Sequence, residues 1–428
     1  INMKRAYIKD LKVGEEVLLR GWVYEYRSLA KLAFLVLRDG SGMVQCISKN
    51  SGIMKNISDL TLETVVEITG KVKKANVKAE FARHDVEIEL VGFKILNKAE
   101  KLPIQVNEKT VKAGLPARLD NRSLDLRKPK VKAIFKIQSV VVNSFREYFF
   151  KKEFMEIQPP AIIASSTEGG TDLFEVKYFD RKAYLAQSPQ LYKQYAAISL
   201  EKVFSTGAIW RAEKHDTSKH INEIRQMDIE VAFEDDIQIM KHLTGVVQHV
   251  VKEVLKECED EVKLLGLKLQ VPKAKYLTYA EAIDILNKNG FKMKIGDDFE
   301  PEAERKLCEL FKDTIVFTYE WPIDIKPFYI WPKDEAKNVS GGFDAIYGGV
   351  EISSGGQRVH VPEILEKQLK SKGLNPKDFK WYIDAFRFGA PMHSGWSIGL
   401  ERLTYAICEL ENIREATMFP RDRRRLTP

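Results

Sequence analysis

Two strand-like segments and the long polar loop between them constrain the fold of this chain more than any other feature. An apolar run at Val203 and Phe204 leads into a polar stretch over residues 210–223, and a second strand-like run follows over residues 227–233. Two such runs in succession predict an antiparallel hairpin. Its loop is rich in cations that can bind phosphate or carboxylate groups, although charge alone favours a solvated surface turn.

A second informative segment lies near the C-terminus. Gly395 and Gly399 flank a short apolar strand, and Arg402 follows three residues later at the start of a helical pattern. Glycines at these positions let the backbone approach a flat ligand, and the arginine can meet a purine or a triphosphate. Alone, this pattern occurs in many protein cores. With the hairpin, and with the helix and proline-ended strand over residues 134–160, it forms a specific set in a fixed order.

Composition is compatible with several functions and excludes a few. The 428 residues and their 44% hydrophobic content suffice for two or three domains. A net charge of +7 permits a polyanionic partner without identifying one. The four cysteines are scattered without a Cys-x-x-Cys pair, which predicts reduced thiols in a cytoplasmic protein and no zinc site. Because no apolar run has the length of a membrane span, we expect no membrane partner.

Residues 1–100 are expected to form short strands, at 16–26, 32–39, 42–48, 65–72 and 85–96. Five strands in this length favour a small Greek-key barrel of the oligonucleotide-binding (OB) kind, whose open face stacks bases on aromatic side chains. Phe34 is the stacking candidate, with Arg27, Gln45 and either Glu87 or Glu89 near it in the pattern. From periodicity alone, a buried strand position explains Phe34 equally well.

A polar, proline-containing stretch over residues 101–130 predicts a hinge, and residues 131–428 mix strands with helices. The helices are expected at 131–151, 236–257, 279–289, 362–372 and 403–410. There is no alternation of strand, helix and strand with a phosphate-binding Gly-x-Gly-x-x-Gly. We therefore predict an α+β domain on an antiparallel sheet and not a doubly wound fold.

In this order of motifs the chain resembles the class II aminoacyl-tRNA synthetases, and within them the aspartyl-tRNA synthetases of the archaeal and eukaryotic type. The segments that carry the resemblance are residues 167–170, 187–194, 211–213, 228, 351–358, 399–402 and 419–428. The resemblance spans nearly the whole chain. It implies a homodimer, a catalytic domain with an antiparallel sheet, and a barrel that holds the tRNA anticodon through Arg27, Phe34, Gln45 and Glu87.

The implied reaction joins the carboxylate of aspartate to the α-phosphate of ATP and then transfers the aspartyl group to tRNA. Because two anions must meet, the site has to supply positive charge and alignment. The resemblance places Arg211 at the α-phosphate and Arg402 at the γ-phosphate and adenine as the catalytic residues. The other implied ATP-binding residues are Glu213, His220, Glu351 and Gly399.

The resemblance also implies a magnesium ion and an aspartate pocket. Asp344, Glu351 and Ser354 offer oxygen ligands to Mg²⁺, although two isolated acids would more often be solvated. Lys193 and Arg358 are the expected counter-charges of the aspartate side chain, because an unpaired buried charge is costly. The remaining expected aspartate-binding residues are Glu168, Gln190, Asp228, Ser354 and His393.

Two alternative functions stay open. An asparaginyl-tRNA synthetase would leave the Lys193 charge without an anionic substrate partner, and a synthetase-like paralogue would bind tRNA or a metabolite without aminoacylation. Ser397 and Trp210 stand where many relatives have glycine and phenylalanine, so a hydroxymethyl group lines the expected adenine pocket beside an enlarged aromatic wall. The residues do not decide whether tRNA(Asp) alone or also tRNA(Asn) is charged.

Overall fold

The computed structural model describes residues 3–109, 111–164, 173–214 and 217–428. The chain divides into two compact units, Ile1–Pro129 with Pro428, and Lys130–Thr427. Among the helices in the described ranges, none combines the length and apolar character needed to cross a bilayer.

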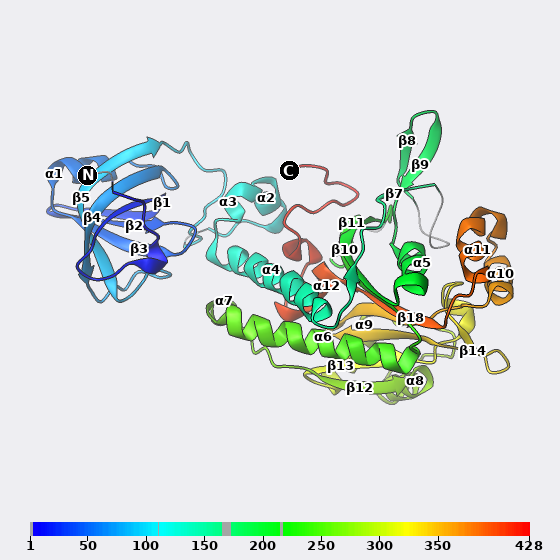
Figure 1. Ribbon diagram of the computed structural model, residues 1–428. Coiled ribbons are helices and arrows are strands. Elements are labelled where there is room, and N and C mark those ends of the chain that lie inside the picture. The colour runs from blue at the N-terminus through cyan, green and yellow to red at the C-terminus, as the bar shows by residue number, and fades with distance from the viewer. Residues whose placement is uncertain (1–2, 110, 165–172, 215–216) are drawn as a thin grey trace. The chain divides into compact units, whose positions relative to one another are not determined.

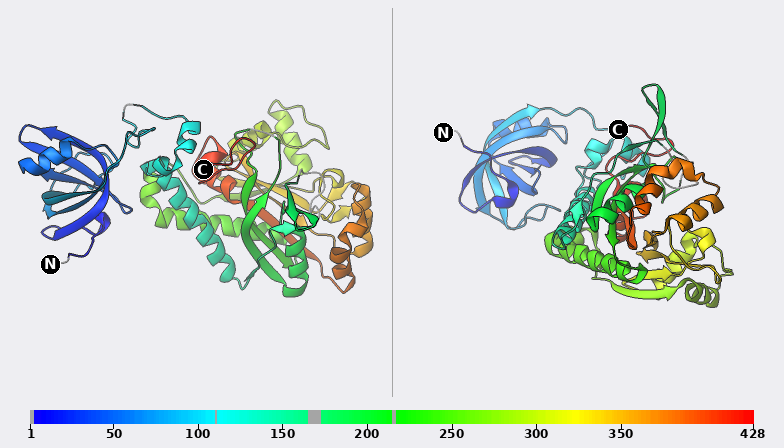
Figure 2. Two further views of the ribbon diagram at one scale, coloured as in Figure 1. Left: turned by 90° about the horizontal axis from the view of Figure 1, so that it is seen from above. Right: turned by 45° about the vertical axis from the view of Figure 1, so that its right-hand side comes forward.

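The first unit is a closed barrel of five strands, as the sequence predicted (Figure 2). The strands are β1 (Glu16–Leu29), β2 (Leu32–Arg38), β3 (Met43–Ser48), β4 (Val65–Lys74) and β5 (Val86–Asn97). They close in the order β1-β2-β3-β5-β4, and only the β3–β5 pair is parallel. Their alternate apolar residues fill the interior, because successive side chains of a strand point to opposite faces. Helix α1 (Ser51–Ser58), which was not expected, begins where the Asn50 side chain accepts from two backbone N–H groups.

Most of the expected hinge is folded against the barrel. It contains two short helices, α2 (Leu115–Asp120) and α3 (Arg122–Asp125). Arg127 lies 3.0 Å from the Glu63 carboxylate, which also holds Arg38 at 2.6 Å. The guanidinium groups of Arg127 and Arg38 both lie over the Trp22 ring, 5.3 and 5.4 Å from its centre. The segment therefore belongs to the barrel's unit as far as Pro129.

The second unit is built on a sheet of eight strands in the order β12-β13-β16-β17-β18-β11-β10-β6. Their bounds are β12 (Lys273–Thr278), β13 (Thr314–Tyr319), β16 (Gly342–Tyr347), β17 (Val350–Gln357), β18 (His393–Gly399), β11 (Glu223–Ala232), β10 (Lys202–Trp210) and β6 (Met155–Glu156). The pairs from β13 to β10 are antiparallel, as predicted. The two outer pairs are parallel, and β12 reaches β13 through α8 (Tyr279–Lys288) and α9 (Pro301–Leu310), as a parallel connection requires.

The two faces of this sheet differ in character. On β11, Met227 and Ile229 enter the large apolar core, while Asp228 and Glu230 belong to the opposite face. The helices that contribute to this core are α4 (Pro129–Phe150), α6 (Asp236–Glu257), α12 (Leu400–Ile407) and, through Val262, α7 (Glu259–Leu265), which continues beyond α6 (Figure 1). The polar face is thus free to form a binding site.

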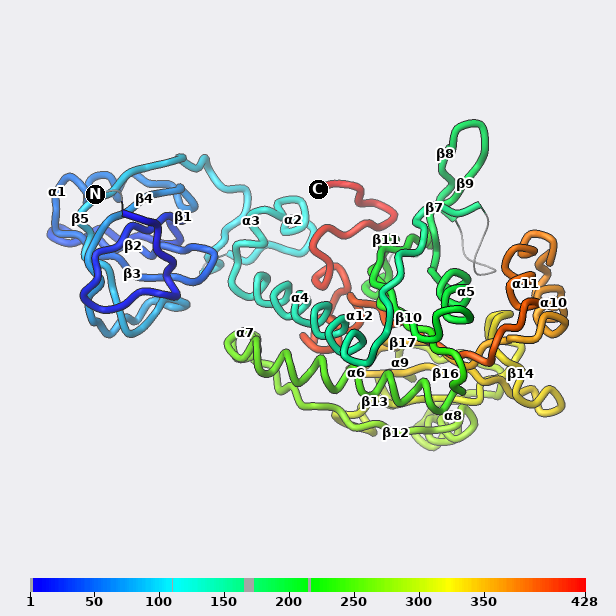
Figure 3. Tube along the Cα trace, viewed as in Figure 1, coloured from blue at the N-terminus to red at the C-terminus, as the bar shows by residue number. Residues whose placement is uncertain are grey.

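Other elements extend this unit beyond the large sheet. They are α5 (Gln190–Leu200), α10 (Pro362–Ser371), α11 (Lys380–Arg387), the short strands β7 (Ile162–Ile163), β14 (Pro332–Asp334) and β15 (Val339–Ser340), and the hairpin of β8 (Glu175–Tyr178) and β9 (Arg181–Leu185). Helices α5 and α11 lie side by side although they are far apart in sequence (Figure 3). Together with α10 they bury a second apolar cluster.

Candidate active site

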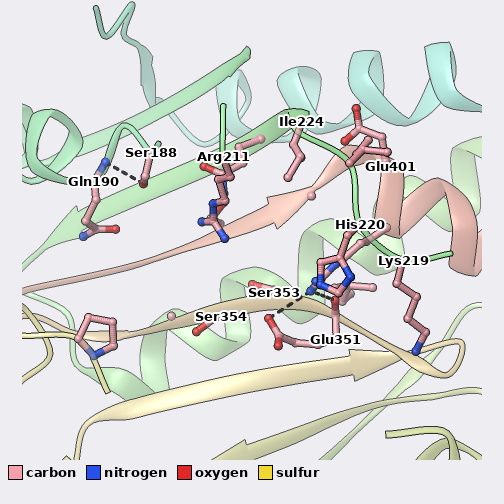
Figure 4. A pocket seen from close by; sticks show the side chains of 18 of the residues that line it. Ser188, Gln190, Arg211, Lys219, His220, Ile224, Glu351, Ser353, Ser354 and Glu401 are labelled. Atoms are coloured by element: carbon pink, nitrogen blue, oxygen red, sulfur yellow. Dashed lines mark hydrogen bonds and ion pairs between the residues drawn. The ribbon is translucent and has the colours of Figure 1, made fainter. Parts of the chain in front are cut away.

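A cavity of about 270 Å³ opens on the polar face of the sheet. Its walls come from the loop between β10 and β11, from β17 and β18, and from the start of α12. Gln190 lies at one end in Figure 4, Lys219 lies at the other, and Arg211 points into the space between them. The hairpin and the glycine-flanked strand that stood out in the sequence therefore line one cavity.

Cations from two different segments meet in this cavity. Arg211 follows the end of β10, and its backbone N–H donates to the carbonyl of Asn222 at 2.9 Å across the loop. Arg402, in the first turn of α12, donates to the Glu351 carbonyl at 2.9 Å. His220 also lines the cavity. Guanidinium groups placed in this way suit phosphate oxygens, which they can bind with two parallel hydrogen bonds.

Glu213 was expected at ATP, but it lines a neighbouring cavity of about 470 Å³ beside Trp210. Its carboxylate lies 3.9 Å from His220 Nε2. Glu213 is absent from the described lining of the first cavity, and His220 lines that cavity beside it.

The three expected metal ligands lie on adjacent strands. Asp344 of β16 pairs with Ser354 of β17, and Glu351 lies further along β17. The Asp344 carboxylate accepts from Lys326 Nζ at 2.6 Å. Burial raises the pKa of Glu351 to about 7, and the nearby carboxylate of Asp344 acts in the same direction.

These ligands fit a cation that arrives together with phosphate. Within the described residues, no three acidic, histidine or cysteine side chains form a metal centre by themselves. Mg²⁺ in proteins is typically held by one or two carboxylates and by substrate phosphates, so a complete protein cage is not required. Besides burial, which is the main cause, the carboxylates of Asp344 and Glu304 raise the pKa of Glu351, and a bound cation would offset this negative charge.

The two expected counter-charges of the aspartate side chain occupy different positions. Arg358 lines the cavity, whereas Lys193 is 1% exposed and is absent from the described lining. Lys193 Nζ donates to Asp228 Oδ1 at 2.9 Å and to the Trp396 carbonyl at 3.1 Å. Burial raises the pKa of Asp228, and the Lys193 ammonium opposes this rise. Direct contact between Lys193 and a substrate stays a prediction.

His393 lies behind the cavity. Gln190 donates to Gln194 Oε1 at 2.8 Å, and Gln194 Nε2 lies 2.9 Å from His393 Nε2. The other ring nitrogen of His393 lies 2.9 Å from the Pro391 carbonyl, so the neutral tautomer with a proton on Nδ1 satisfies both contacts. Burial lowers the pKa of His393 to about 4. A chain of hydrogen bonds thus links His393 to Gln190, and the contact of His393 with substrate stays a prediction.

Ser354, Gly399 and Glu168 were also expected at the site. Ser354 and Gly399 line the cavity, and their contacts with the cation and with ATP stay predictions. Glu168 and the two glycines after it lie outside the described residues.

The anticodon candidates gather on the outside of the barrel. Arg27 of β1 is opposite Phe34 of β2, and Gln45 of β3 is opposite Glu87 of β5. Phe34 is half-buried between the fully buried Ala33 and Leu35, which places its ring on the outer face. Gln45 Nε2 donates to Glu87 Oε2 at 3.1 Å.

Sequence reasoning missed Glu230 and Asn222. Glu230 binds Arg358 Nε at 2.8 Å, and it could have been noticed because it follows Asp228 by two positions on the same strand face. The Asn222 side chain donates to the carbonyls of Arg211 and Glu213 and holds the two ends of the cationic loop together. No local sequence pattern predicts these two hydrogen bonds.

Comparison with known proteins identifies the family. Residues 115–423 match the model for tRNA synthetases class II (D, K and N). The chain belongs to this family. Residues 17–96 of the synthetase match the OB-fold nucleic acid binding domain, in agreement with the closed barrel.

Full-length relatives are similar to the synthetase over both units. It is 42% identical to the aspartate–tRNA(Asp/Asn) ligase of Methanocaldococcus jannaschii, over 99% of this chain and 97% of that protein. It is 38% identical to the aspartate–tRNA(Asp) ligase of Thermoplasma acidophilum, over 100% of both chains. Among solved structures, the asparaginyl-tRNA synthetase of Pyrococcus horikoshii with asparaginyl-adenylate has a TM-score of 0.91 at 32% identity, covering 99% and 100% of the two chains. The aspartyl-tRNA synthetase of Entamoeba histolytica has a TM-score of 0.90 at 33% identity, covering 100% and 93%.

Proposed function

We propose that this synthetase is an aspartate–tRNA ligase. An oxygen of the aspartate α-carboxylate attacks the α-phosphorus of ATP, pyrophosphate leaves, and aspartyl-adenylate remains. A hydroxyl of the 3′-terminal ribose of tRNA then takes the aspartyl group, and AMP leaves. The observation that carries the proposal is a single cavity in which Arg211 and Arg402 meet Glu351, with Arg358 at the amino-acid end.

The residues of the cavity suit charge neutralisation and alignment. Arg211 supplies positive charge where the two anions approach each other, and Arg402 supplies it at the far end of the triphosphate. Preorganised donors of this kind favour the transition state because they need no reorganisation when charge develops. Mg²⁺, held by Asp344, Glu351 and Ser354, would neutralise phosphate charge when it is bound.

The tRNA substrate is proposed from the relatives and the barrel. The relatives named for tRNA(Asp) and for tRNA(Asp/Asn) have similar identities to this chain, so tRNA(Asp) is the proposed substrate and tRNA(Asn) is the second transcript to test. On the barrel, the outward ring of Phe34 offers a stacking surface beside Arg27 and the Gln45–Glu87 pair.

A homodimer is also proposed. Strand β6 ends the order of the large sheet, and two large apolar side chains, Phe150 at the end of α4 and Met155 of β6 itself, are 54% and 53% exposed. An exposed strand edge with apolar neighbours is a site of association. Light scattering on the purified chain distinguishes a dimer from a monomer.

The test of the proposed function is ATP–pyrophosphate exchange with each of the twenty amino acids in the presence of Mg²⁺. We expect exchange with aspartate. Arg211→Ala and Arg402→Ala should each lose about 2–4 kcal/mol of transition-state stabilisation, as expected for removing one preorganised donor. Arg225→Ala is the matched control, because this exposed arginine of β11 pairs with Glu223 at the surface.

Two outcomes would replace the proposal. Exchange with asparagine and not aspartate would assign an asparaginyl-tRNA synthetase. No exchange with any amino acid would assign a paralogue without aminoacylation activity.

A further inference from the structure

Four buried charged side chains form a continuous series of alternating sign beside the cavity. Asp228 Oδ1 lies 2.9 Å from Lys193 Nζ, which lies 3.6 Å from Glu230 Oε2. Glu230 in turn accepts from Arg358 Nε at 2.8 Å and from Arg358 Nη2 at 3.3 Å. None of the four residues is more than 2% exposed. The two anions and two cations compensate one another, as buried charges must.

The two end residues of this series each line a described cavity, and the two middle residues line neither of these cavities. Arg358 lines the main cavity, and Asp228 lines an adjoining cavity of about 200 Å³ that shares Gln226 with the first. Lys193 and Glu230 are absent from the described lining of both. The series therefore presents a cation at one end and an anion at the other. This pattern matches an amino acid that carries an ammonium group and a second carboxylate.

Glu230 has almost no freedom to move. A methyl group added at Gly395 would lie 2.0 Å from Glu230 Oε2, so the backbone of β18 packs directly against the carboxylate. The bonds from Glu230 occupy the Nε and Nη2 donors of Arg358. A guanidinium has five N–H donors in a fixed plane, so holding one edge fixes the direction of the donors on Nη1.

From this geometry we propose that Glu230 is a positioning residue that sets amino-acid specificity. It never touches the substrate. It orients Arg358 toward the side-chain carboxylate of the amino acid, and with Asp228 it fixes Lys193 inside the protein. The proposal rests on the proposed function, because it takes aspartate as the amino acid whose carboxylate Arg358 receives.

The test compares two substitutions in pyrophosphate exchange, with kcat and KM measured separately for aspartate, asparagine and ATP. Glu230→Gln keeps the shape but places an NH₂ group or a weaker acceptor against the guanidinium. Glu230→Asp keeps the charge but shortens its reach by one methylene. Both should reduce kcat/KM for aspartate by about 30-fold or more, as truncating a buried charge pair does, and should lower the preference for aspartate over asparagine. KM for ATP should stay within about twofold of wild type, because the phosphate contacts lie elsewhere.

Asp236→Asn is the matched control. Asp236 is a buried carboxylate of the same unit, bonded to Lys333 at 3.0 Å and outside the described cavity lining. It should lose folding stability without changing the preference between aspartate and asparagine. A Glu230→Gln enzyme that keeps its aspartate kcat/KM and its preference would overturn the proposal and leave the proposed function standing. Equal losses for aspartate, asparagine and ATP would show a purely structural role. A wild-type protein that does not activate aspartate would overturn the proposed function itself.

Discussion

Single buried ionisable residues of the catalytic unit are stabilised in two ways. Lys193 lies between two carboxylates, those of Asp228 and Glu230, while burial lowers the pKa of the His393 ring to about 4. The immediate partners differ, because the Lys193 ammonium group meets two carboxylates and the two ring nitrogens of His393 meet the Gln194 amide and the Pro391 carbonyl. The roles of Lys193 and His393 can be tested through folding stability as well as through activity.

Removing Lys193 should destabilise the fold. Lys193→Leu leaves Asp228 and Glu230 without their shared cation, and breaking a buried ion pair costs about 3–5 kcal/mol of unfolding free energy. Urea denaturation measures this loss. If stability stays within about 1 kcal/mol of wild type while aspartate activation alone collapses, Lys193 contacts the substrate directly.

His393 predicts a pH dependence of stability. Its pKa falls from the ordinary 6.5 to about 4 in the folded protein, so between these values the unfolded chain binds more protons than the native one. The free energy of unfolding therefore decreases as pH falls from 6.5 to 4, by at most about 3 kcal/mol from this residue. Denaturation curves measured across this range should show that the free energy of unfolding changes less with pH for His393→Gln than for wild type. Identical slopes would show that His393 does not titrate in this way.

At the scale of elements, alternation along a barrel strand separates side chains that pack in the core from side chains that point outward. On β2, Ala33 and Leu35 fill the core and Phe34 turns outward, so one substitution can change binding without emptying the interior. The same rule governs β11, where the apolar core and the charged series share one strand.

Phe34→Ala should therefore separate the two steps of the reaction. Loss of a stacking surface should weaken aminoacylation of tRNA(Asp) by about 1–3 kcal/mol and leave pyrophosphate exchange unchanged. Val91→Ala, at a barrel residue that is 75% exposed, is the control and should alter neither assay. A parallel loss in both assays would mean that removing Phe34 damages folding.

At the scale of the whole molecule, two compact units with separate apolar cores predict two unfolding transitions. Calorimetry checks this. Aspartate with ATP and Mg²⁺ should raise only the transition of the catalytic unit, and an anticodon stem-loop should raise only that of the barrel, because a ligand stabilises the unit that binds it. One transition that both ligands shift equally would contradict independent units.

The architecture was largely predictable from local patterns, and the contacts between the site residues were not. Helix α6 was predicted with the bounds that the structure shows, because Asp235 and Gln238 form a capping box before a strongly periodic segment. Helix α5 was missed, since it follows Pro189 with little periodicity and no side-chain cap. The loop and β18 residues were found through their motifs. The pairing of Glu230 with Arg358 joins residues 128 positions apart, which no local pattern encodes.

The contact of Arg127 with Glu63 bears on how such enzymes can be recombined. A chimaera joined after β5, at Asn97, would take Glu63, Arg38 and Trp22 from one parent. Arg127, whose guanidinium contacts Glu63 and lies over the Trp22 ring, would come from the other parent. A cut between Pro129 and Lys130 keeps these groups together. The barrel and the segment that follows it as far as Pro129 should therefore be exchanged together. The boundary of the exchanged part lies at the first turn of α4.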